Sequence, residues 1–99
     1  MWFFTAYVIW GLSERRGSIS IPMISYFIFE ELWKHGIVIN DSEKELEHEI
    51  NYLSSIGAIE IEGQYIRVKE DRMRELLRAI GNIRVEEYLR KIDRVIAEA

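Results

Sequence analysis

The chain has 99 residues, is 48% hydrophobic and carries a formal net charge of −4, as expected of one globular domain spanning residues 1–99. It contains no cysteine, which excludes disulfide bonds, zinc–thiolate sites and cysteine nucleophiles. The acidic balance argues against a generally basic coat for nucleic acid.

Residues 2–16 are predicted to form a helix that is apolar on nearly every side. A helix of this kind must be covered on more than one side, and Trp2, Phe3, Tyr7 and Trp10 belong to its apolar surface. The apolar run within it is about half as long as the roughly 20 residues of a membrane span, and it lacks the flanking features of a signal peptide. We therefore expect a buried helix, no membrane segment and a cytoplasmic protein.

A second apolar helix is predicted between Pro22 and His35, after a short alternating segment at residues 18–21. Pro22 suits the first turn of a helix, where its missing amide costs nothing. Gly36 is expected to end this helix, whose apolar residues again exceed one stripe. Residues 37–39 are either buried in a bend or extended, and the sequence leaves both alternatives open.

A central helix follows, because Leu46, Ile50 and Leu53 recur at helical spacing and such spacing indicates one buried face. Two overlapping capping boxes fit its start, Asn40–Glu43 and Ser42–Glu45. Each has a short polar residue followed three positions later by an acid, the pair that satisfies free amides at a helix start. The sequence does not choose between them.

A two-stranded hairpin is predicted after Gly57, which ends the central helix as a C-cap. Residues 58–62 and 65–69 alternate between apolar and polar side chains, as half-buried strands do, and a Gly63–Gln64 loop suits a type II′ turn. The predicted register pairs Ile61 with Ile66 and Ile59 with Val68 on the inner face, and Glu60 with Arg67 and Glu62 with Tyr65 on the outer face.

The carboxy-terminal residues 70–99 are predicted to be helical, with a break at Gly81–Asn82. Two apolar stripes at helical spacing support this prediction, one on each side of the break. The first stripe is Met73, Leu76, Leu77 and Ile80, and the second is Tyr88, Leu89, Ile92, Val95 and Ile96.

The helix, glycine and hairpin of residues 41–69 resemble the second half of a winged-helix, or winged helix-turn-helix, domain, and the chain is similar to small archaeal and bacterial transcription regulators of this superfamily. The resemblance implies a mostly helical fold with a small β-hairpin wing in residues 1–69, followed by a helical extension, residues 70–99, for dimerisation. It also implies that residues 18–21 join the wing as a third strand and that residues 43–56 form the recognition helix.

The resemblance therefore implies a DNA-binding transcription regulator, whose recognition helix lies in the major groove. Asn51 suits the recognition of adenine, and Lys44 suits contact with phosphate or guanine. The residues that this helix would present are Glu43, Lys44, Glu47, His48 and Asn51. Basic residues that suit contacts with phosphate follow in the wing and in the next helix: Arg67, Lys69, Arg72, Arg74 and Arg78.

Charge favours a different function. Residues 41–62 hold seven acids and one lysine, and each acid that faces phosphate opposes the release of counterions on which DNA affinity depends. In the predicted register, Glu60 also lies opposite Arg67, and such cross-strand pairs neutralise each other. The alternative prediction is therefore a winged-helix module for protein–protein contact that does not bind DNA.

The surplus of apolar surface predicts a partner protein, and a second copy related by a two-fold axis is the simplest one. We expect the first and last helices to form the interface of this homodimer. Its predicted residues are Trp2, Phe3, Tyr7, Trp10, Tyr88, Leu89, Ile92, Val95 and Ile96.

Catalysis has little support in the sequence. His48 and Glu49 begin a zinc-protease helix motif, but Tyr52 occupies the position of its second histidine. No glycine-rich phosphate loop is present. We therefore predict no catalytic residue, no metal-binding residue and no cofactor, and we do not expect an enzyme.

Overall fold

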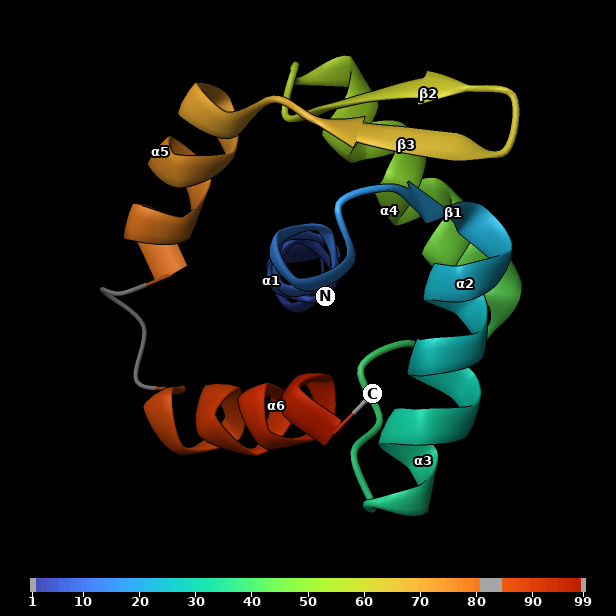
Figure 1. Ribbon diagram of the computed structural model, residues 1–99, viewed down its shortest axis with the longest axis vertical. Coiled ribbons are helices and arrows are strands. Elements are labelled where there is room, and N and C mark those ends of the chain that lie inside the picture. Colours follow the sequence, from blue (N-terminus) through green and yellow to red (C-terminus); the bar gives the residue numbers. More distant parts are fainter. Residues whose placement is uncertain (1, 81–84, 99) are drawn as a thin grey trace.

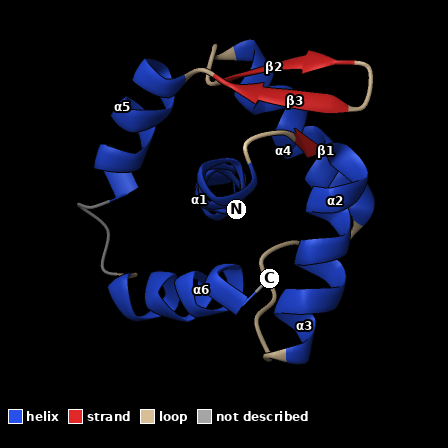
Figure 2. Ribbon diagram, in the orientation of Figure 1, coloured by secondary structure: helices blue, strands red, loops and turns tan. Residues whose placement is uncertain are grey.

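The computed structural model describes residues 2–80 and 85–98, and Figure 2 shows their helices arranged with one small sheet. Helix α1 (Trp2–Arg16) lies at the centre of this arrangement (Figure 1). It contacts later helices and the sheet of the same chain, and it buries apolar residues on several sides. The prediction that this helix needs cover on more than one side is therefore confirmed.

Helices α5 (Glu70–Ile80) and α6 (Glu86–Glu98) lie beside α1 on different sides (Figure 1). Three residues of α6 that were predicted to meet a second copy, namely Ile92, Val95 and Ile96, are buried in the core of the same chain. The structure thus corrects their assignment to a homodimer interface, because these side chains already cover α1.

The seam between α1 and α6 is closely packed. A Cβ atom at Gly11 would lie 2.6 Å from Cδ1 of Ile96, so the absence of a side chain at this position allows the two helices to approach. At the edge of the seam, the Tyr7 hydroxyl donates a 2.6 Å hydrogen bond to Oδ1 of Asp93. Burial, together with this bond to a carboxylate, raises the pKa of Tyr7 above its ordinary value.

One continuous helical run lines another side of the molecule, made of α2 (Ile21–Tyr26), η1 (Phe27–Glu31) and α3 (Leu32–Lys34). Ser20 caps its start by accepting a 3.3 Å hydrogen bond from the Met23 amide, and the proline lies in the first turn as predicted. The middle segment η1 is a π-helical turn, which the sequence did not predict.

The stretch before α4 (Glu43–Ser55) is irregular. No strand forms at residues 37–39. Ile37 and Ile39 are buried and Val38 is exposed, so the buried alternative holds for two of the three residues. Ser42 caps α4 by accepting a 3.2 Å hydrogen bond from the Glu45 amide, which decides between the two capping boxes.

A polar cluster holds α4 against α1. Thr5 of α1 and Asn40, which precedes α4, are both buried. The Thr5 hydroxyl donates a 2.5 Å hydrogen bond to Oε1 of Glu49 and contacts Oδ1 of Asn40 at 3.3 Å. Asn40 therefore faces the core and leaves the capping of α4 to Ser42.

The sheet has the strand order β1-β3-β2. Strands β2 (Ile59–Glu62) and β3 (Tyr65–Val68) form the predicted hairpin with the predicted register, and β1 (Ile19–Ser20) pairs with β3 as the expected third strand. In the hairpin loop, Gly63 has a positive φ of 64° and Gln64 does not, as a type II′ turn requires. A slip of one residue would expose the apolar inner face, so the register is well specified.

The predicted break at Gly81–Asn82 lies outside the described residues, since α5 is described to Ile80 and the next described residue is Val85. Among the described helices, none has the length and apolarity needed to cross a membrane. The predicted fold class, mostly helical with a small β-hairpin, agrees with the observed elements.

Close packing of α6 on α1 predicts that Gly11→Ala has opposite effects in two backgrounds. In the parent, the new methyl group meets Cδ1 of Ile96, and overpacking of this kind costs about 1–3 kcal/mol. In an Ile96→Val background that atom is absent, so the better helix propensity of alanine stabilises by about 0.5–1 kcal/mol. Thermal unfolding of the four proteins measures both effects, and an equal change in both backgrounds would contradict the packing.

Candidate functional site

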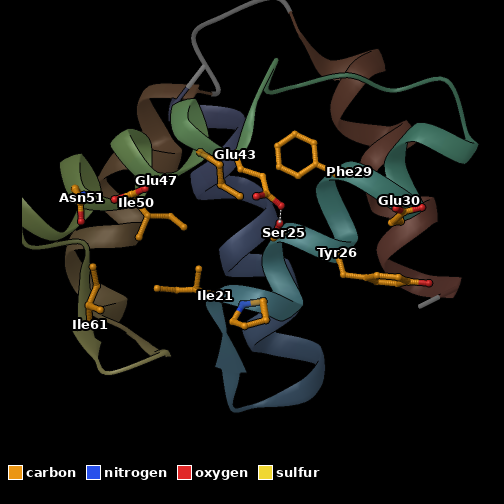
Figure 3. Close-up of a pocket in the computed structure, with 12 residues that line it drawn as sticks. Ile21, Ser25, Tyr26, Phe29, Glu30, Glu43, Glu47, Ile50, Asn51 and Ile61 are labelled. Atoms are coloured by element: carbon orange, nitrogen blue, oxygen red, sulfur yellow. Dashed lines mark hydrogen bonds between the residues drawn. The ribbon is translucent and has the colours of Figure 1, made fainter.

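A groove of about 740 Å³ lies between the helical run α2–η1 and the helix α4. The lining residues of α4 recur at three- and four-residue spacing, so they form one face of that helix. Strand β2 contributes Ile61 to the same hollow (Figure 3). Its volume lies within the range of about 300–1,000 Å³ that is typical of ligand pockets.

The floor of the groove is apolar. Leu46 and Ile50 of α4 are each 2% exposed, and Ile21, Phe29 and Ile61 are half-buried against the same core. Figure 3 shows side chains reaching this hollow from α2, η1, α4 and β2. The floor can therefore bury apolar groups of a bound molecule.

The rim of the groove is acidic on both walls. Glu30 lies on the η1 wall, Glu43 and Glu47 lie on the α4 wall, and all three side chains are exposed. The Ser25 hydroxyl donates a 3.2 Å hydrogen bond to Oε1 of Glu43, which joins the two walls (Figure 3). No lysine or arginine occurs among the described residues that line the groove, so the rim attracts positive charge.

The π-helical turn η1 sits in one wall of this groove. A π turn has hydrogen bonds between residues five apart, where an α-helix has them between residues four apart. Ser25 and Phe29, and likewise Tyr26 and Glu30, are four apart and line the groove together. π-Turns are rare and are often found at functional sites, which supports a functional role for this wall.

Sequence reasoning missed the groove and most of its lining. A signal was present, because the apolar residues of the second helix exceeded one stripe. That surplus indicated an interface, but it did not indicate which residues would face outward. The structure places Ile21 and Phe29 on the groove floor and the 56%-exposed Tyr26 on its rim.

The DNA-binding residues predicted on α4 all lie on its exposed face. Lys44, His48 and Asn51 are exposed, and Asn51 also lines the groove. Glu43 and Glu47 lie beside them on the same face, so the local charge is negative. This is the opposite of what a phosphate backbone attracts.

The two basic residues predicted on the hairpin are held by one carboxylate. Arg67 and Lys69 both form ion pairs with Glu60, the latter at 2.5 Å. The ammonium of Lys69, followed by the guanidinium of Arg67, holds the pKa of Glu60 below its usual range. The predicted pairing of Glu60 with Arg67 is confirmed, and the structure adds Lys69 to it.

The predicted arginines of α5 lie apart from the α4 residues. Arg72 donates to the Ile56 carbonyl at 3.0 Å and to Glu75 at 2.8 Å. Arg74 lies over the Trp10 ring at 5.9 Å, and Arg78 is exposed one turn further on.

The structure does not join these basic residues into one surface. Lys44 and Ile56 are separated by about 18 Å along α4 at 1.5 Å per residue, and Arg72 lies at the Ile56 end. Helix α5 itself lies on the far side of α1 from α2 (Figure 1). The predicted DNA-binding set is therefore split between separate parts of the molecule.

Six of the predicted homodimer residues remain at the surface in part. They are half-buried at the edges of α1 and α6, unlike the three that the core encloses. Phe3, Tyr7 and Trp10 recur at four- and three-residue spacing, so they share one face of α1. The other three are Trp2, Tyr88 and Leu89.

Comparison of the chain with protein-family models, with curated proteins and with solved structures found no match. Among the described residues, no group of three histidine, aspartate or glutamate side chains is placed to hold a metal ion.

The Glu60 ion pairs predict a stability difference that depends on pH. The pKa of Glu60 is lowered in the folded protein, so its ionised form stabilises the fold. This contribution to the free energy of unfolding is present above the unfolded-state pKa of about 4.3, and it is lost as the pH falls through the folded-state pKa. At pH 7 we expect the parent to have a higher melting temperature than the Glu60→Gln variant, and we expect this difference to disappear below about pH 4. Thermal melts from pH 3 to 7 measure the difference, with Glu62→Gln as the control for the loss of one exposed carboxylate. An equal gap at both ends of the range would contradict the ion pairs.

The homodimer stays a prediction, and it now rests on the Phe3, Tyr7 and Trp10 face of α1. We expect light scattering at low micromolar concentration to give twice the 11.8 kDa mass of one chain. Changing Tyr7 to Glu should give the single-chain mass, because a charge on this face opposes its burial. Circular dichroism checks that the variant is folded, and a parent mass of 11.8 kDa would contradict the homodimer.

Proposed function

We propose that the chain is a winged-helix module for protein–protein contact, which binds another protein at the groove between α2 and α4. The element order supports the winged-helix part of this proposal. The chain runs helix, strand, two helical stretches and hairpin, and the first strand pairs with the second strand of the hairpin. This is the order that the resemblance implies, with α4 in the place of the recognition helix.

The observation that carries the proposal is the acidic rim on an apolar floor. Glu43 and Glu47 project from the helix that would enter the DNA major groove. Duplex DNA carries one negative charge per about 1.7 Å of its axis, so insertion of this helix brings like charges together. An apolar floor gains nothing from a phosphate backbone, whereas it stabilises the apolar side chains of a protein partner.

The hairpin supports the same function. A wing that contacts phosphate needs free positive charge, and Arg67 and Lys69 are engaged by Glu60. Phosphate would have to displace that carboxylate from two cations at once. The same hairpin instead supplies Ile61 to the groove, which is a contribution suited to an apolar partner.

A DNA-binding regulator is the second candidate, and the exposed arginines of α5 favour it. Arg72, Arg74 and Arg78 lie outside the acidic groove, so they can approach a phosphate backbone without bringing Glu43 and Glu47 close to it. Arg72 and Arg74 are also partly occupied, by Glu75 and Glu70 respectively. Contacts of this kind position a protein on DNA but carry no sequence information.

The two candidates differ in how they bind a fluorescent random-sequence duplex. For the interaction module we expect a Kd weaker than about 10⁻⁴ M at physiological salt, the weak end of nonspecific binding. Any binding at low salt should fall when Arg72 and Arg74 are changed to Gln, and should rise with Glu47→Gln. Fluorescence anisotropy at two salt concentrations measures this. Tight, sequence-selective binding that is lost with Asn51→Ala would overturn the proposal in favour of the regulator.

A further inference from the structure

We propose that the groove binds an amphipathic helix of another protein, in which one apolar stripe is flanked on both sides by lysine or arginine. This inference rests on the proposed function and names the class of partner. It follows from the shape of the floor, from the placement of charge on the two walls and from the charge of the chain itself.

The apolar floor of the groove determines which residues of the partner must be apolar. The floor is formed by Leu46 and Ile50 of α4, Ile21 and Phe29 of the helical run α2–η1, and Ile61 of β2. The part of α4 that lines the groove, from Glu43 to Asn51, is about 12 Å long at 1.5 Å per residue. A partner helix would therefore seat about two turns, with apolar residues three and four apart, as in other helix-in-groove complexes.

The walls set the flanking charges. Glu30 lies on one wall and Glu43 and Glu47 on the other, so acids stand on both sides of the apolar floor. A basic amphipathic helix has the complementary arrangement, because residues next to its apolar stripe point toward the two walls. An extended strand presents its side chains on two opposite faces, and would direct half of them away from the groove.

An exposed aromatic residue marks where such a contact would be strongest. Tyr26 lines the groove beside Glu30 and is 56% exposed. Tyrosine is enriched among the residues that dominate binding energy in protein interfaces. Its ring can cover the apolar stripe of the partner, while the neighbouring carboxylate of Glu30 attracts a cation.

A second copy of this chain is a poor fit to the groove. The chain carries a net charge of −4, so a second copy offers this groove little of the positive charge that the acidic rim attracts. Its exposed arginines on α5 are already beside acids, as in the pairs Arg72–Glu75 and Arg74–Glu70. If the groove of one copy bound α5 of another, the two surfaces in contact would be different. Such a head-to-tail contact extends into open chains of molecules and does not form a closed dimer. The complementary occupant is therefore a basic segment of a different protein.

The test uses a fluorescent 18-residue peptide with leucine along one helical stripe and lysine on both sides of it. Glu30→Gln with Glu47→Gln removes one acid from each wall and leaves the Ser25–Glu43 bond in place. Glu14→Gln with Glu87→Gln is the matched control, because it removes two exposed acids outside the groove. Two further peptides have the same leucine and lysine content in scrambled order, or glutamate in place of lysine.

We expect the amphipathic lysine peptide to bind the parent, and the two groove changes to weaken its affinity roughly fivefold or more, as the loss of two surface ion pairs implies. The control pair should change affinity by less than about twofold, since only distant and screened charges are lost. Tyr26→Ala should also weaken binding. In amide NMR spectra, the peptide should shift the signals of Ser25, Phe29 and Glu47.

Other results would overturn the inference. These are no binding of the lysine peptide, equal binding of the scrambled or glutamate peptide, equal weakening by the two variant pairs, or NMR shifts confined to α5. Failure of the proposed function gives a different result, namely tight sequence-selective binding of duplex DNA. If neither the lysine peptide nor the duplex binds, the basic helix is the wrong partner class while the interaction module stands.

Discussion

Coverage of α1 is the constraint on which the rest of the structure depends. Its apolar residues face several sides, and a helix of this kind is stable only when other elements cover it. Helices α4, α5 and α6 and the sheet all contact it, and α6 approaches closely enough to bring Ile96 against Gly11. Each covering element turns its apolar side inward, so the charged residues of the chain are left to define the outer surface.

The outer chemistry of α4 follows from this packing. Leu46, Ile50 and Leu53 face the core, and the buried hydroxyl of Thr5 binds Glu49, which fixes the rotation of α4 about its axis. Once that rotation is fixed, Glu43 and Glu47 lie on the exposed face, and they border the groove. The acidic rim is therefore tied to the same contacts that hold the helix in place.

Prediction from sequence succeeded where local chemistry decides the structure. The hairpin register followed from period-two alternation, since a slip would move every apolar side chain to the wrong face. The start of α4 was ambiguous because Asn40 and Ser42 are equivalent as local caps, and only the burial of Asn40 beside Thr5 separates them. The need to cover α1 was also predictable. The source of the cover was not, because sequence alone does not say whether Ile92 and its neighbours meet their own chain or a second copy.

The groove depends on features that no local pattern encodes. It requires the helical run α2–η1 and the helix α4, which are separated in sequence, to lie side by side, so that Phe29 lines the same hollow as Leu46 and Ile50. The hairpin links this geometry to the charge pattern, because neighbouring residues of β2 point to opposite faces of the sheet. Ile61 lines the groove, while Glu60 on the other face engages Arg67 and Lys69. Side chains alternate along a strand, so the placement that adds apolar surface to the groove also neutralises the cations that DNA binding would need. The contribution of Ile61 to the groove and the pairing of the hairpin cations with Glu60 are thus two results of one register.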